Sequence, residues 1–188
     1  MSTHDSSRFE IQFRRCADDL CEQGVAALGE LYDLAAPRLL RFAAAITRSD
    51  QDAEDALQWA FVRIARAPQR LAVARLPWHY LLRVVRNEAV SILRRSSPLS
   101  GGDSLPEKEW HDPVPIDGDE TADRVRSALK RLPAAQAEVV ALKIWEEMTF
   151  AQIAEISGES PNTVASRYRY ALEKLSHHLQ QLQEAGRE

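Results

Sequence analysis

A run of short polar and basic side chains follows a sharp corner near the C-terminus, in residues 149–175. Gly158 ends one helical pattern and Pro161 stands in the first turn of the next, which is typical of two helices joined by a tight turn. Short hydroxyl and amide side chains allow close approach to a partner, and arginines supply charge-assisted hydrogen bonds to base edges and phosphates. The outward-facing candidates are Ser160, Asn162, Thr163, Ser166, Arg167, Arg169 and Tyr170. The pattern predicts a DNA-binding helix-turn-helix, with an ordinary helical hairpin as the alternative.

Several helices must position that row of side chains. Thr149 is the predicted N-cap of the first helix of the corner, with Gln152 completing a capping box, and Ser160 is the predicted N-cap of the second. Two further helices are expected before them, over 121–132 and 134–147. The inward stripe of the last helix is expected to consist of Val164, Tyr168, Ala171, Leu172 and Leu175.

Apolar residues at helical spacing also dominate the first half of the chain. The predicted helices cover 25–47, about 49–66 and 78–95, with a loop over 67–77. Pro37 is expected to kink or divide the first of these helices. Ser49 or Asp50 is the expected N-cap of the second. Before residue 25, both a short helix and a disordered arm fit the sequence.

An acidic segment, 96–120, separates the two helical halves. It contains four Pro and three Gly and lacks helical or strand periodicity, which is typical of a linker. Residues 1–95 hold 14 basic and 12 acidic side chains, residues 96–122 hold one Lys and seven acids, and residues 123–188 hold nine of each sign. The formal net charge of −4 therefore comes from the linker, and basic faces remain possible in both halves.

Other function classes find little support. The chain has no glycine-rich phosphate loop, and its five His show no spacing for nucleophilic or metal chemistry, so we expect neither an enzyme nor a small-molecule cofactor. Cys16 and Cys21 lack the spacing of a metal site and are read as ordinary thiols. No apolar run approaches a membrane span, and the N-terminal residues lack a signal core, so a cytoplasmic protein is expected.

Longer stretches of the sequence match a known pattern. The first half contains AEDALQWAFVRIARAP at 53–68 and WHYLLRVVRNEAVSILRR at 78–95, and the second half contains LPAAQAEVVALKIWEEMTFAQIAEISGESPNTVASRYRYALEKL at 132–175. In this order and spacing, with the acidic segment between them, they resemble bacterial RNA polymerase sigma factors of the extracytoplasmic-function (ECF) type. The resemblance covers about 26–95 and 122–179.

The resemblance implies an all-α chain of two small domains, like sigma regions 2 and 4, joined by a flexible acidic linker that runs toward the active-site cleft and RNA exit path. The expected divisions are an N-terminal extension 1–24, a region-2-like domain 25–95, the linker 96–120, a region-4-like domain 121–183 and a tail 184–188. The implied partners are core RNA polymerase, through its β′ coiled coil and β flap, promoter DNA, and an anti-sigma protein of the kind that often holds sigma factors of this type. The alternatives are a helix-turn-helix regulator that does not serve as a promoter-specificity subunit, and a helical scaffold that binds only proteins.

The resemblance assigns opening of the minus-ten promoter element to the third helix of the first half. Rings there would stack on unpaired bases, and cations would follow the single-stranded backbone. The implied residues are Trp78, Tyr80, Arg83, Arg86, Asn87, Arg94 and Arg95. The family usually has Trp where Tyr80 stands and Asp where Ser91 stands. Core packing is the alternative for the two rings.

The resemblance assigns polymerase binding to the preceding helix. The implied residues are Asp52, Asp55, Gln58, Trp59 and Phe61. Spacings of three place the acids and the amide on one helical face, which suits a basic partner helix. The family often has Glu where Trp59 stands, so the alternatives there are an interface anchor and a helix rotated about its axis.

The last helix would bind the minus-thirty-five element. Where the family often has Lys, this chain has Ala165, and Tyr170 replaces a common Arg. Fewer cations predict a smaller phosphate contribution and a weaker salt dependence of DNA binding.

Overall fold

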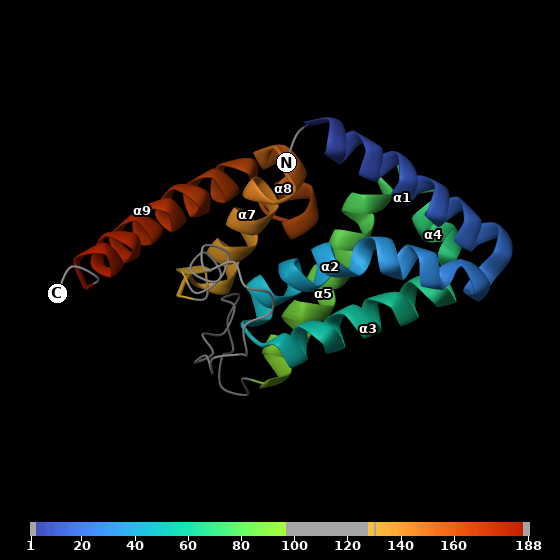
Figure 1. Cartoon of the computed structure of the whole chain (residues 1–188), viewed down its shortest axis with the longest axis horizontal. Helices are drawn as coiled ribbons and strands as arrows, with labels where there is room; N and C mark the ends of the chain where they lie inside the picture. Colours follow the sequence, from blue (N-terminus) through green and yellow to red (C-terminus); the bar gives the residue numbers. More distant parts are fainter. Residues whose placement is uncertain (1–2, 97–127, 130, 186–188) are drawn as a thin grey trace.

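The computed structural model of the chain describes residues 3–96, 128–129 and 131–185, and every regular element in these ranges is helical (Figure 1). The all-α prediction is therefore confirmed. The predicted linker lies outside the described residues apart from Ser96, and most of the helix predicted over 121–132 lies outside them too.

The first half forms an N-terminal block. Its elements are α1 (Thr3–Gln23), a 3-10 turn (Gly24–Ala27), α2 (Leu28–Thr47), α3 (Asp50–Arg66), α4 (Pro68–Ala72) and α5 (Pro77–Ser96). Pro37 does not divide α2, which continues through it. The loop expected over 67–77 is wrong in part, because Pro68 begins the short helix α4. Ser49 caps α3 by accepting a hydrogen bond from the Asp52 amide over 3.2 Å, which confirms one of the two expected caps.

The core of this block is built from the apolar faces of the long helices, and α2 contacts both α3 and α5. The largest fully buried side chains include Phe13, Leu20, Leu31, Leu39, Phe42, Ile46, Leu57, Ile64, Leu81 and Leu82. Phe13 and Leu20 come from α1, so the N-terminal residues form a helix that contributes to this core. Full burial of each such side chain contributes about 1.5–3 kcal/mol to folding.

The second half forms a C-terminal block of α7 (Ala134–Ile144), α8 (Phe150–Ser157) and α9 (Pro161–Ala185). The first turns of α9 pack beside α7 and α8, and its later turns project away from the rest of the molecule (Figure 1). Leu172, expected to face inward, is instead 43% exposed. That prediction is wrong.

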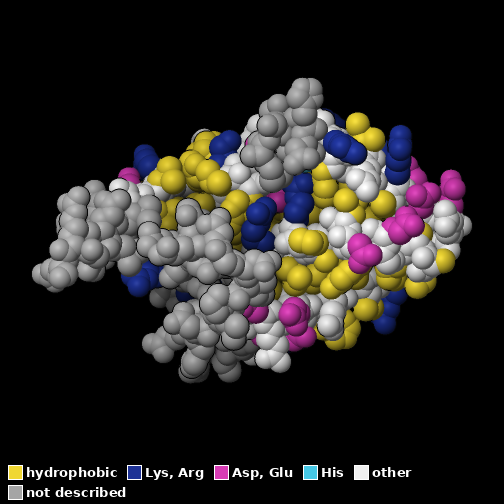
Figure 2. All heavy atoms as spheres, in the orientation of Figure 1, with side chains coloured by type: hydrophobic (Ala, Val, Ile, Leu, Met, Phe, Trp, Pro, Cys, Tyr) yellow, Lys and Arg dark blue, Asp and Glu magenta, His cyan; other side chains and the backbone are white. Residues whose placement is uncertain are grey.

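The two blocks lie against each other. Helix α7 contacts α2, and α8 contacts α5. One hydrophobic cluster contains residues of both blocks, with Val139, Leu142 and Ile153 joining the core of the N-terminal block. Figure 2 shows Lys and Arg side chains near the middle of one face, where α2 approaches α7. None of the helices in the described part of the chain combines the length and apolarity of a membrane span.

Candidate nucleic-acid and protein interfaces

The corner between α8 and α9 has the local chemistry expected of a helix-turn-helix. Thr149 and Gln152 form a complete capping box at the start of α8. Gly158 ends α8 at φ 75°, in the left-handed region where a side chain would be strained, and its amide bonds the Ala154 carbonyl over 2.9 Å. Ser160 accepts a hydrogen bond from the Thr163 amide over 3.1 Å and so caps α9. The predicted Thr149–Gln152 capping box, the helix end at Gly158 and the Ser160 N-cap are therefore confirmed.

The polar row on α9 faces outward over its first turns. Ser160, Asn162, Ser166, Arg169 and Tyr170 are exposed, and Thr163 is half-buried. Val164 and Ala171 are buried on the opposite side, where they hold the helix on its block. The helix is therefore held in place on one side and exposes hydroxyl, amide and guanidinium groups on the other.

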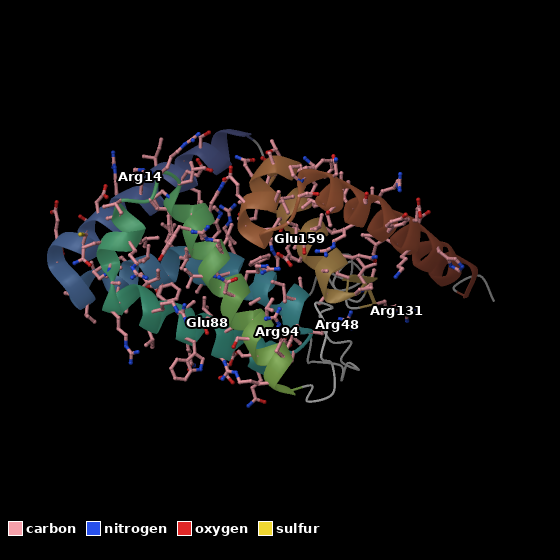
Figure 3. The ribbon with its side chains drawn as sticks, turned by 180° about the vertical axis from the view of Figure 1, so that it is seen from behind. Arg14, Arg48, Glu88, Arg94, Arg131 and Glu159 are labelled. Carbon is pink, nitrogen blue, oxygen red and sulfur yellow. The ribbon has the colours of Figure 1, made fainter. Side chains whose placement is uncertain are left out.

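The two arginines of α9 differ in their surroundings. Arg167 is half-buried and lies 3.0 Å from the carboxylate of Glu159 at the corner (Figure 3 labels Glu159). Arg169 is exposed, and its guanidinium lies over the Tyr170 ring at 5.1 Å from the centroid. Of the two, Arg169 is the more accessible cation.

Helix α5 carries the second set of candidates, and most of them lie on its accessible side. Arg83, Asn87, Arg94 and Arg95 are exposed, and Figure 3 shows Arg94 near the C-terminal end of α5. Tyr80 is half-buried, with the Arg83 guanidinium 5.8 Å from its ring centroid.

Trp78 does not join that accessible set. It is only 4% exposed, and Phe9 and Phe13 of α1 meet its ring edge-on at centroid distances of 4.8 and 5.1 Å. Its indole Nε1 donates to Glu146 of the C-terminal block over 2.8 Å. In this arrangement Trp78 packs in the core and cannot stack on a base.

Arg86 is also turned inward. Its Nε donates to the Glu138 carboxylate of α7 over 2.8 Å, and its side chain is 16% exposed. Burial raises the pKa of the Glu138 carboxyl, and the Arg86 charge opposes that rise. The structure thus pairs one predicted promoter contact with an acid of the other block.

A cleft of about 420 Å³ separates the start of α5 from α8. Its lining includes three arginines of the N-terminal block, namely Arg70, Arg75 and Arg83, together with the half-buried Tyr80 ring and Glu155 of α8. His79 also lines it, and burial lowers the pKa of that imidazole. The positive charge of the cleft therefore comes from the arginines.

Helix α3 presents the candidate protein-binding face. Asp55, Gln58 and Trp59 are exposed, and Asp52 is half-buried. The Trp59 ring is 53% exposed, which is unusual for so large an apolar side chain. Phe61 points inward instead, with 5% exposure and its ring edge against Tyr32 at 5.0 Å.

The structure also reveals contacts that the sequence reasoning missed. Arg38 of α2 bonds Glu146 at 2.6 Å and stacks over the Phe9 ring at 3.9 Å from its centroid. Glu138 lies within the otherwise apolar run 137–142. A charged residue in such a run is the sequence signal that could have indicated a buried ion pair. Glu146 gave no comparable signal, because its partners lie far away in the sequence.

The described ranges contain no metal site, and the Cys16 thiol is shielded. No group of three His, Cys, Asp or Glu side chains there is placed to hold a metal ion. Cys16 is buried, and burial raises the pKa of its thiol, which suppresses the reactive thiolate.

Comparison with known proteins defines the class to which this fold and these surfaces belong. Residues 31–98 match the family model "Sigma-70 region 2", and residues 122–175 match "Sigma-70, region 4". The chain is 33% identical over 145 residues to an RNA polymerase sigma-E factor of Streptomyces avermitilis, covering 76% of this chain and 79% of that protein. It is 33% identical over 144 residues to the sigma-E factor of Streptomyces coelicolor, covering 75% of this chain and 79% of that protein.

Two solved structures share the fold. One is the sigma factor RpoE of Bartonella quintana in complex with the anti-sigma factor NepR, with a TM-score of 0.66, 22% identity, and coverage of 83% of this chain and 98% of that chain. The other is CnrH in complex with the cytosolic domain of CnrY, with a TM-score of 0.62, 23% identity, and coverage of 89% and 96%.

These matches define a two-region promoter-specificity protein. The chain belongs to the sigma-70 family and is an RNA polymerase sigma factor of the ECF type. It is not an enzyme, and its partners are core RNA polymerase and promoter DNA. The match to region 2 disfavours the alternative of a regulator that never joins polymerase, because such a regulator would not need this block.

Proposed function

We propose that α9 reads the minus-thirty-five element of the promoter in duplex form. The observation that carries this proposal is the exposed polar row that begins directly after the Gly158 corner. The N-terminal turns of such a helix fit the major groove, where Asn162 and Arg169 would meet base edges and the hydroxyls of Ser160, Thr163 and Ser166 would meet phosphates. Arg167 and Tyr170 complete the proposed surface.

Helix α5 has the second role in this proposal, the opening of the minus-ten element. Its exposed arginines and Asn87 suit a single-stranded backbone and an unpaired base edge. The complete proposed set is Trp78, Tyr80, Arg83, Arg86, Asn87, Arg94 and Arg95. Trp78 and Arg86 would have to become accessible first, because Trp78 is covered by Phe9 and Phe13 of α1 and bonds Glu146. Arg86 is paired with Glu138 of α7.

Helix α3 is the proposed contact with the β′ coiled coil of polymerase. Asp52, Asp55 and Gln58 would face basic residues, and the exposed Trp59 would act as an anchor. Phe61 would support the face from within, since its side chain is buried.

The proposed domain limits are those expected from the sequence, 25–95 and 121–183, and the proposed location is the cytoplasm. We also infer an anti-sigma protein as an inhibitory partner. The support for this partner is that the two similar solved structures, CnrH and RpoE, are complexes with CnrY and the anti-sigma factor NepR.

Run-off transcription with core polymerase and a selected promoter library tests the proposal. The wild-type chain should give transcripts from promoters that share one minus-thirty-five sequence, and Asn162→Ala should lower the yield or relax the preference at one position. Lys174→Ala, an exposed cation further along α9, is the matched control and should leave both unchanged. An Asn162→Ala variant with wild-type yield and preference would remove this role from α9.

A further inference from the structure

The turn between α4 and α5, residues 73–76, lies beside the proposed minus-ten surface. Two buried side chains flank it, namely Leu71 of α4 and Trp78 in the first turn of α5, which are 0% and 4% exposed. The turn itself contributes little to the core, and Val73 is 81% exposed. Its conformation therefore depends on contacts of its backbone more than on burial of its own side chains.

Arg14 of α1 makes such backbone contacts. Its Nη2 donates to the Ala74 carbonyl over 3.2 Å and to the Arg75 carbonyl over 2.7 Å, and Figure 3 labels Arg14 on α1. In the described part of the chain, no backbone amide bonds either of these two carbonyls. A charged guanidinium that bonds two successive carbonyls restrains the direction of both peptide groups.

Helix α1 is a suitable base for this contact. Phe13, the neighbour of Arg14, is buried and meets the Trp78 ring edge-on at a centroid distance of 5.1 Å. Ala17 and Leu20 are buried further along the same helix, and α1 contacts both α4 and α5. Arg14 therefore extends from a helix whose own position is set by the core.

The turn supplies one wall of the cleft described above. Arg75 lines this cleft together with Arg70, Tyr80 and Arg83. Tyr80 and Arg83 belong to the proposed minus-ten set, whereas Arg70 and Arg75 are additions that the structure places beside them. An aromatic ring among guanidinium groups suits an unpaired base and its phosphates, because the ring stacks on the base and the cations bind oxygens.

We propose that Arg14 is a positioning residue for recognition of the minus-ten strand. It holds the backbone of residues 74–75 so that the Arg75 side chain stands beside Tyr80 and Arg83, where an unpaired base binds. The inference rests on the proposed role of α5 at the minus-ten element. It adds that a residue of α1 affects which base is preferred without contacting DNA, because a recognition group must be held close to its productive geometry.

The test measures base preference apart from folding and polymerase assembly. Holoenzyme made with core RNA polymerase selects from a pool of single-stranded DNA 20-mers with six randomised positions, and sequencing of the bound fraction gives the preferred bases. Fluorescence anisotropy then gives the Kd for the preferred 20-mer and for its single-base variants at two salt concentrations. Thermal unfolding and competition for core enzyme against a labelled wild-type chain are the checks.

The variants separate positioning from direct contact. Arg14→Gln removes the charged donor, Arg14→Lys keeps a charged donor to the carbonyls, and Arg75→Gln removes the side chain that is positioned. Arg15→Gln, at the neighbouring exposed arginine of α1, is the matched control.

We expect Arg14→Gln to fold and to compete for core enzyme like the wild type. Its affinity for the preferred 20-mer should fall about fivefold or more, as for loss of one base-edge contact, while its affinity for a 20-mer with the least preferred base at that position stays the same. Arg75→Gln should lose preference at the same position, Arg14→Lys should lie between Arg14→Gln and the wild type, and Arg15→Gln should match the wild type.

Wild-type base preference in a folded Arg14→Gln protein would overturn the proposal. An equal loss of affinity for all sequences with a lower salt slope would also overturn it, because Arg14 would then contact a phosphate directly. If Arg14→Gln does not fold, Arg75→Gln carries the test, and wild-type preference in that variant would count against the inference. Failure of the wild-type holoenzyme to enrich any sequence would instead refute the proposed role of α5.

Discussion

The Arg167 guanidinium lies 3.0 Å from the Glu159 carboxylate, across the corner that joins α8 to α9. The acid stands two residues before the first residue of α9 and the arginine within the second turn of that helix, so the pair ties the corner to α9. A cation next to a carboxylate attracts phosphate less than a free one. Glu159 thus moderates the charge of the proposed recognition surface.

Removal of this acid should strengthen DNA binding. In Glu159→Gln, Arg167 loses its partner charge, and the affinity of the holoenzyme for a duplex minus-thirty-five fragment should rise up to about fivefold, because a partly exposed pair is worth about 0–1 kcal/mol. Titration by fluorescence anisotropy at two salt concentrations measures the effect. Weaker binding by Glu159→Gln would show that the pair instead holds Arg167 in a DNA-competent position.

Arg169→Ala should have the opposite effect. This exposed cation has only the Tyr170 ring beside it in the structure's described contacts, and its loss should cost about 1–3 kcal/mol if it reads guanine. If it meets a phosphate, the loss is similar for all sequences and the salt slope falls by about 0.9. Salt titrations on matched and mutated minus-thirty-five duplexes separate these cases, with Lys174→Ala as the control. Unaltered affinity and slope would exclude Arg169 from the interface.

Two substitutions at Ser160 should separate its capping role from its contact role. Ser160→Ala removes the acceptor for the Thr163 amide and should lower the free energy of unfolding by about 1 kcal/mol. Ser160→Asp keeps an acceptor, so stability should stay near wild type, but its charge should repel DNA phosphates. Urea unfolding and duplex binding measure the two properties. Wild-type DNA binding by a stable Ser160→Asp protein would mean that this end of α9 does not approach the backbone.

Trp59→Ala should weaken assembly with core polymerase and leave folding intact. More than half of this side chain is exposed, so truncation removes little buried surface from the fold, whereas an interface anchor is typically worth about 2 kcal/mol or more. Competition for core enzyme against a labelled wild-type chain measures the loss, with thermal unfolding as the folding check. Val25→Ala, another exposed apolar position, should compete as well as wild type. Equal competition by Trp59→Ala would move the polymerase contact to another face.

The features that the sequence predicted well are local in the chain. The caps Ser49, Thr149 and Ser160 and the left-handed Gly158 depend on neighbours within a few residues, so their patterns can be read directly. The exposure of Leu172 could not be predicted in this way, because the apolar stripe continues at helical spacing while α9 leaves the body of its block (Figure 1).

The contacts between the blocks could not be predicted for a related reason. Arg86 and Glu138 are 52 positions apart, and Arg38 and Glu146 are 108 apart, so nothing in the sequence spacing pairs them. For the same reason, the sequence could not decide whether Trp78 packs in the core or stacks on a base. Its ring packs against Phe9 and Phe13 of α1, and its indole donates to Glu146, which follows α7. Both contacts depend on tertiary packing.

Helix α1 precedes the region-2 match, yet its residues help to position α5. The match begins at residue 31, yet Phe9 and Phe13 press against Trp78, and Arg14 donates to the carbonyls of Ala74 and Arg75 just before α5 begins. A shortened chain that begins at residue 31 would expose the Trp78 indole to solvent. It would also lose the hydrogen bonds from Arg14 to the segment just before α5. Such a fragment would report on a loosened version of the helix that we propose opens the promoter.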